Sequence, residues 1–179
     1  ELAKKQNKII HIDHIMIFHP AIKKIKEIIS SGEIGEVLFI NSTRKSLGQF
    51  RKDVSSMWDL AVHDLSIIDY LMDGKSPISI KASGEKFYNP KESITFVNLK
   101  YENFSVHLES NWLSPIKERN ITIVGSKKML VYEDLKLENK LTVYEKNVEV
   151  VSGENITDEN YLVKTNEFGT YSPYIKPED

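Results

Sequence analysis

Residues 57–82 read MWDLAVHDLSIIDYLMDGKSPISIKA, and the spacing of the hydrophobic residues changes within them. Up to Met72 the apolar positions recur every three or four residues, at Ala61, Leu65, Ile68 and Met72, which predicts a helix over residues 57–72. Asp73-Gly74 supplies a stop for that helix, and short strand-like runs follow from Ser76 onward.

The segments on either side give the order of the remaining elements. Residues 9–18 are apolar on both alternating faces, which predicts a short buried strand. Pro20 then suits the first turn of a helix that ends at Gly32, and we expect Ile22, Ile25 and Ile29 to form the buried face of this helix. We further expect a strand and a loop before the second helix, at residues 36–44 and 45–56.

The second half of the chain predicts a meander of short strands. We expect these strands at residues 78–82, 93–101, 104–112, 120–124, 129–132, 141–145 and 148–151, with tight turns at 102–103, 125–128 and 146–147. Helices gathered early and strands gathered late predict an α+β fold. Its sheet is expected to be open and largely antiparallel, or mixed, with the two main helices packed on one face. We expect a tail at residues 1–8, one domain at 9–164 and an irregular C-terminal segment at 165–179.

Composition excludes several classes of protein. The 24 basic and 26 acidic residues give a net charge of -2 and are interspersed, which argues against nucleic acid as a partner. The absence of cysteine excludes disulfide scaffolds and thiolate metal sites and favours a reducing compartment. No apolar run approaches the roughly 20 residues that a membrane-spanning helix needs. We therefore expect a cytoplasmic protein with no membrane partner.

One polar stripe on the second helix is the candidate for chemistry. At about 100° per residue, Asp59, His63, Ser66 and Tyr70 fall within one narrow stripe, away from the apolar face. A carboxylate one turn before an imidazole can orient the ring, and we expect it to raise the pKa of His63 so that the ring can act in acid–base chemistry. From spacing alone, the alternative is an exposed ion pair of little energetic value.

Other clusters have simpler alternatives. His11, Asp13, His14 and His19 contain metal-ligand types, but strand geometry turns His14 away from its neighbours, and we expect no metal site. Trp112, Lys117 and Arg119 surround a Pro-bearing connection that could bind an anionic sugar or phosphate, or could be a solvated turn. The sequence has neither a G-x-G-x-x-G pattern nor a P-loop, so we expect no cofactor-binding residues in this chain.

The order of several motifs resembles the C-terminal domain of the glucose–fructose oxidoreductase, inositol dehydrogenase and rhizopine-catabolism (Gfo/Idh/MocA) family. The form Trp-Asp-Leu-Ala-x-His-Asp looks most like the branch that acts on nucleotide sugars. The matching pieces are His14, residues 18–21, 29–37, 42–44, 51–53, 58–64 and 112–115, Lys117, Arg119 and residues 124–126.

The resemblance implies a domain that binds a sugar or nucleotide sugar beside a separate Rossmann domain holding NAD or NADP. It implies His63 as general acid/base, and Asp59 as its orienting partner and a substrate ligand. We further expect substrate contacts from Arg44, Trp112, Lys117 and Arg119. It also implies a homo-oligomer, a dimer or tetramer, that packs through the open sheet face. Because the family's Gly-rich loop and Glu-Lys-Pro motif are not in this sequence, we expect a part of a longer enzyme that is inactive alone. The alternative is a stand-alone, non-catalytic sugar-binding or oligomerisation module.

Overall fold

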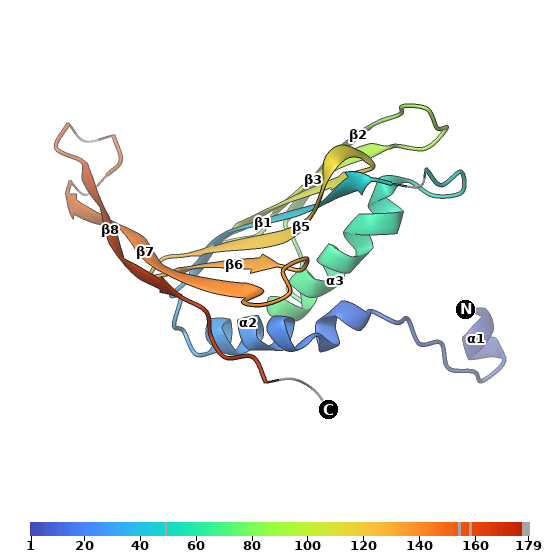
Figure 1. Cartoon of the computed structure of the whole chain (residues 1–179), viewed down its shortest axis with the longest axis horizontal. Helices are drawn as coiled ribbons and strands as arrows, with labels where there is room; N and C mark the ends of the chain where they lie inside the picture. Colours follow the sequence, from blue (N-terminus) through green and yellow to red (C-terminus); the bar gives the residue numbers. More distant parts are fainter. Residues whose placement is uncertain (49, 154, 158, 177–179) are drawn as a thin grey trace.

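The computed structural model describes residues 1–48, 50–153, 155–157 and 159–176, and its main feature is one eight-stranded sheet (Figure 1). The spatial order of the strands is β2-β3-β4-β1-β5-β6-β7-β8. β1 runs parallel to β4, and the other neighbouring pairs are antiparallel. The strands are β1 (Val37–Leu47), β2 (Ser79–Glu85), β3 (Ile94–Lys100), β4 (Ser105–Asn111), β5 (Leu113–Gly125), β6 (Met129–Glu133), β7 (Leu141–Ser152) and β8 (Leu162–Tyr171).

The helices lie on one face of this sheet. The two main ones are α2 (Pro20–Ser30) and α3 (Val62–Leu71), and both pack beneath the central strands (Figure 1). Shorter helical segments precede them, namely α1 (Leu2–Lys5), the 3-10 helix η1 (Ile15–Phe18) and the π-helical turn η2 (Met57–Ala61). The prediction of an α+β fold, with a mixed sheet and helices on one face, is confirmed.

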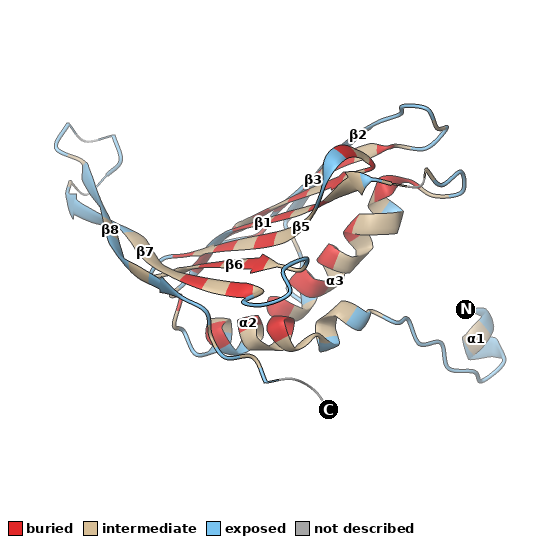
Figure 2. Ribbon diagram, viewed as in Figure 1, coloured by how far each residue is buried: buried red, intermediate tan, exposed pale blue. Residues whose placement is uncertain are grey.

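The core forms where the helices meet the central strands. Ile22 and Ile25 of α2 and Ile67 of α3 are fully buried there. Buried residues form bands along the central strands, whereas β8 and the outer part of β7 are exposed (Figure 2). Along β3 and β4 burial alternates from one residue to the next, as expected for a sheet with one covered face.

The first predicted strand is wrong. Residues 9–14 form no helix or strand, and Ile9 is 96% exposed. A strand forms only where a neighbour satisfies its backbone hydrogen bonds, and no described strand pairs with this segment. The apolar pattern indicated a tendency toward strand without showing a partner.

The predicted turn at residues 146–147 is also wrong, and so is the predicted irregular segment over residues 165–171, whereas residues 172–176 form no helix or strand. β7 continues through both turn residues because β8 pairs along it, with Asn147 opposite Asn166 and Val148 opposite Thr165. β8 has a weak sequence signal because it lies at the sheet edge and few of its side chains are covered. The turns predicted at residues 102–103 and 125–128 are confirmed, since they join β3 to β4 and β5 to β6.

Two further segments extend strands beyond their predicted ends. β1 continues to Leu47, inside the predicted loop. The predicted connection after Trp112 is the beginning of β5, where Leu47 faces Leu113 but Lys45 faces Glu118. Four residues of β5 therefore bulge out between these two pairs, and Pro115 is tolerated there because a bulge does not need its missing N–H.

Candidate functional site

Asp59 lies in the widened helical turn that precedes α3. The turn η2 spans Met57–Ala61, and α3 continues directly from it at Val62, so Asp59 and His63 stay on consecutive turns. Single π-helical turns inside α-helices occur frequently at functional sites. The predicted helix over residues 57–72 is thus present, but it begins with a distorted first turn.

Two side chains outside the helix hold the carboxylate of Asp59. The indole Nε1 of Trp112 donates a hydrogen bond to Asp59 Oδ2 at 3.1 Å. Arg51 Nη1 lies 3.6 Å from Asp59 Oδ1. Trp112 is only 1% exposed, so this contact links the helix firmly to the end of β4 and the beginning of β5. In the described chain no hydrogen bond joins Asp59 to His63, and an orienting role for Asp59 stays a prediction.

His63 is partly buried, and its pKa is lowered from the usual value of 6.5. Burial is the largest cause, followed by the positive charge of Arg44, and Arg119 acts in the same direction. Asp64 and Asp59 oppose this shift without overcoming it. Asp59 thus acts on the pKa of His63 in the expected direction, but the expected net rise is wrong, because burial and the two arginines outweigh the carboxylates. A neutral imidazole at pH 7 has a free nitrogen that can accept a proton.

Arg44 and Asp64 form a buried ion pair beside His63. Arg44 Nη2 donates to Asp64 Oδ1 at 2.8 Å, and Arg44 Nε lies 3.2 and 3.1 Å from the two carboxylate oxygens. Burial disfavours the charge of Arg44, but the hydrogen bonds and charge of Asp64 outweigh it and raise the pKa of Arg44. Because this fork is already engaged, the structure gives Arg44 a protein partner where the sequence suggested a substrate.

Arg119 and Lys117 lie on β5, on either side of the end of the bulge. Arg119 Nη1 approaches Asp134 Oδ2 at 3.4 Å, and the hydroxyl of Tyr132 donates to Asp134 Oδ1 at 2.9 Å. Burial disfavours ionised Asp134, but the hydrogen bonds from Tyr132 and Arg119 prevail and lower its pKa. Lys117 is exposed in the bulge. The structure thus places Arg119 near His63 and leaves Lys117 at the surface.

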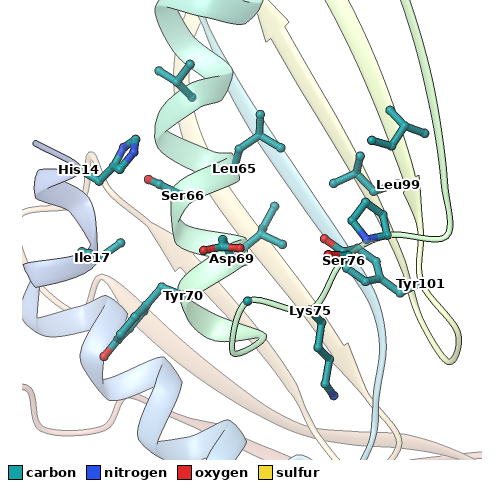
Figure 3. Close-up of a pocket in the computed structure, with 15 residues that line it drawn as sticks. His14, Ile17, Leu65, Ser66, Asp69, Tyr70, Lys75, Ser76, Leu99 and Tyr101 are labelled. Carbon is teal, nitrogen blue, oxygen red and sulfur yellow. The ribbon is translucent and has the colours of Figure 1, made fainter. Parts of the chain in front are cut away.

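A cavity of about 580 Å³ lies against the other part of the polar stripe (Figure 3). Ser66 and Tyr70 line it, with His14 at the end near Ser66 and Tyr101 on the opposite side. Val62, the neighbour of His63, also lines it, whereas Asp59 and His63 do not. The predicted stripe is therefore divided, because Asp59 contacts Trp112 whereas Ser66 and Tyr70 line the cavity.

Among the residues that the structure describes, the early histidines do not gather into a metal site. In the described part of the chain, no group of three or more His, Asp or Glu side chains could hold a metal ion. His19 instead caps α2, since its Nδ1 accepts a hydrogen bond from the N–H of Ala21 at 3.1 Å.

No described helix is long and apolar enough to cross a membrane.

Sequence reasoning gave no site role to Asp64 or Asp134, and it placed Arg51 only in the loop before the second helix, where it could close over a ligand or be solvated. Asp64 lies on the apolar face of the helix, at an angle where core residues are expected, and a carboxylate there implies a buried cation. That signal was present in the sequence. Asp134 and Arg51 lie in connections, and no periodicity marks them.

The chain is similar to one protein family and to individual oxidoreductases. A family model described as "GFO/IDH/MocA C-terminal domain" matches residues 22–131. An "Uncharacterized oxidoreductase" of Streptococcus pneumoniae serotype 4 is 25% identical over 145 residues, which are 71% of this chain and 39% of that protein.

Two solved structures show the same fold. The inositol dehydrogenase homolog from Azotobacter vinelandii, complexed with NADH and myo-inositol, has a TM-score of 0.69 and 17% identity over 93% of this chain and 44% of its own. A UDP-N-acetylglucosamine 3-dehydrogenase from Acidithiobacillus ferrooxidans has a TM-score of 0.65 and 19% identity over 97% of this chain and 51% of its own. The chain thus spans roughly half or less of the length of these relatives.

Proposed function

This chain belongs to the GFO/IDH/MocA family as a C-terminal domain, and from that membership we propose that it is the substrate-binding part of an NAD(P)-dependent oxidoreductase acting on a sugar or nucleotide sugar. The observation that carries the proposal is that a neutral, partly buried His63 lies one helical turn after an Asp59 carboxylate that Trp112 holds by a hydrogen bond. The sugar and nucleotide-sugar dehydrogenases that share its fold support the substrate class.

His63 acts on the proton of the substrate hydroxyl. Because its pKa is lowered, the ring is neutral at pH 7 and accepts the O–H proton as the carbinol carbon is oxidised. In the reverse direction the protonated ring returns that proton to the carbonyl oxygen. Asp59 accepts a hydrogen bond from a neighbouring substrate hydroxyl while Trp112 and Arg51 hold it in place. Arg119, with Lys117 at the surface beside it, binds anionic groups of the substrate.

The residues of this chain do not fit a dinucleotide. The sequence lacks the Gly-rich turn, and β1 and β4, which pair in parallel within the described part of the chain, have no Gly-rich turn leading into a helix. A nicotinamide cofactor bound elsewhere in the intact enzyme would exchange hydride with the carbinol carbon. The roles given to His63 and Asp59 do not depend on which nicotinamide cofactor is used.

Substitutions in the intact enzyme test the assignment. We expect His63→Ala and Asp59→Asn each to reduce turnover by about 10²-fold or more, because each removes a group that handles a proton or substrate hydroxyl. The assay is nicotinamide absorbance with a panel of inositols and UDP-sugars. The exposed His11→Ala is the matched control and should retain activity. Full activity in His63→Ala would overturn the acid–base role. Absence of turnover with the whole panel in the unsubstituted enzyme would favour a non-catalytic sugar-binding module.

We also propose that the open face of the sheet packs against a second copy. This face carries partly exposed apolar side chains across three central strands, including Phe39, Phe96 and Val124. Apolar surface that remains on one side of a sheet typically marks an interface. Analytical ultracentrifugation should therefore show a dimer or larger species, and Phe39→Glu should shift it toward monomer. A monomer at high concentration before any substitution would contradict this packing.

A further inference from the structure

The ion pair between Arg44 and Asp64 joins the sheet to the helix that carries His63. Arg44 lies on β1 and Asp64 on α3, and the residues are 5% and 2% exposed. Three hydrogen-bond contacts of 2.8 to 3.2 Å connect the guanidinium to the carboxylate. Asp64 directly follows His63 in the chain, so the pair fixes the backbone one residue from the imidazole.

A contribution to the stability of the fold does not by itself explain why this ion pair is buried here. Desolvating two charges costs about as much as their attraction returns, and well-packed apolar pairs are often equally stable. A bidentate contact does differ from apolar packing in one respect, because its two parallel hydrogen bonds accept only one relative placement of helix and strand. An apolar contact would allow α3 to rotate or slide by a fraction of an ångström.

We propose that the Arg44–Asp64 pair is a positioning device for His63, which locks α3 against β1 so that the imidazole reaches the substrate hydroxyl. The proposal rests on the acid–base role of His63 given above. Arg44 and Asp64 are then positioning residues that act through His63.

The charges around His63 agree with this arrangement. Arg44 faces it from β1 and Arg119 from β5, while Asp64 and Asp59 face it from its own helical segment. Arg44 and Arg119 favour the neutral ring, and the two carboxylates favour the charged ring. The charge of Arg44 acts on the ring more strongly than that of Asp64, so the pair that joins the helix to the sheet also favours the neutral form of His63 that accepts a proton.

Three variants separate positioning from stability. Arg44→Lys keeps the positive charge but loses the planar fork. Asp64→Asn keeps the shape but loses the carboxylate charge. Arg44→Met with Asp64→Leu replaces the pair by apolar side chains and should stay folded. The control is Lys24→Met with Glu27→Leu, which removes an exposed ion pair of α2 whose N–O distance is 3.0 Å.

Two measurements are made on each variant. In the intact enzyme, kcat and KM are determined as a function of pH. In the 179-residue chain, NMR follows the ring resonances of the five histidines, with His63 assigned by His63→Gln. We expect Arg44→Lys and the Met/Leu variant to lower kcat by about 10- to 100-fold with little change in KM, as misplacement of a reacting group does. The His63 ring shifts should change in both, while Asp64→Asn should lower the pKa of His63 further.

A merely structural pair gives a different result. The folded Met/Leu variant would then keep its kcat and its His63 resonances, and that outcome would overturn the proposal. If the Met/Leu variant fails to fold, Arg44→Lys decides, since unchanged kcat and ring shifts in that variant would also overturn it. The acid–base role is tested separately, because an active His63→Ala enzyme would refute that role even where the NMR shifts show that the pair places the ring.

Discussion

Replacing Trp112 by Phe should weaken the fold measurably, through the loss of one hydrogen bond to Asp59. Trp112 is 1% exposed, and its Nε1 donates to Asp59 Oδ2 at 3.1 Å. A hydrogen bond to a charged group contributes about 1.5–3 kcal/mol. Because Asp59 is 27% exposed and also close to Arg51, water and that guanidinium replace part of the lost contact. With the smaller ring added, we expect a loss of about 2–3 kcal/mol.

The measurement is urea unfolding of this chain followed by far-UV circular dichroism. With a slope of about 2 kcal/mol per M, the midpoint should fall by about 1 M or slightly more. The control is Trp58→Phe, since Trp58 is 67% exposed and its replacement should change stability by less than about 0.5 kcal/mol. A double-mutant cycle with Asp59→Ala should show coupling of about 1 kcal/mol or more. If Trp112→Phe matches Trp58→Phe, or if the cycle shows no coupling, the anchoring of Asp59 is refuted.

Two further predictions follow from the pKa of His63 and from one close backbone contact. The folded-state pKa of His63 lies below the unfolded value of 6.5. At pH values between the two, the unfolded chain therefore binds more protons than the folded chain, and His63 lowers the stability of the fold as the pH falls through this window. Raising the pH from about 5.5 to about 7.5 should therefore raise Tm more in the unsubstituted chain than in His63→Gln, and equal increments would contradict the lowered pKa. Gly125→Ala should cost about 2 kcal/mol or more in chemical unfolding, because its Cβ would lie 2.2 Å from the Ile34 carbonyl oxygen and 2.8 Å from that of Lys128. Gly48→Ala, whose Cβ meets nothing closer than 3.4 Å, is its control, and similar losses in both would exclude the clash as the cause.

Local patterns predicted those parts of the fold that depend on neighbours close in sequence. α2 forms at Pro20–Ser30 with Ile22 and Ile25 buried, as the helical spacing indicated, although Ile28 is buried where Ile29 was expected and Ile29 is only partly buried. The hairpin between β3 and β4 likewise needs only a short turn at residues 102–103. The prediction failed for residues 9–14 and for β8, and in both cases the outcome depends on a strand partner that a single segment does not reveal.

At the site, too, local sequence patterns predicted some features and missed others. Asp64 shows how more of the site could have been predicted. The stripe from Asp59 to Tyr70 follows from helical geometry alone, but a single stripe cannot show that Asp59 faces Trp112 while Ser66 and Tyr70 face a cavity. Those directions depend on how α3 is rotated against the sheet, and the hydrogen bonds from Arg44 to Asp64 join the helix to β1 in the observed rotation. Both charged residues stand where their elements predict burial, Arg44 on the covered face of a strand and Asp64 among the apolar positions of a helix. Two opposite charges in predicted core positions are expected to pair, because neither is stable there alone. Predicting an ion pair between Arg44 and Asp64 from the sequence would have indicated which face of α3 meets β1. It would also have indicated the side of the helix on which His63 lies.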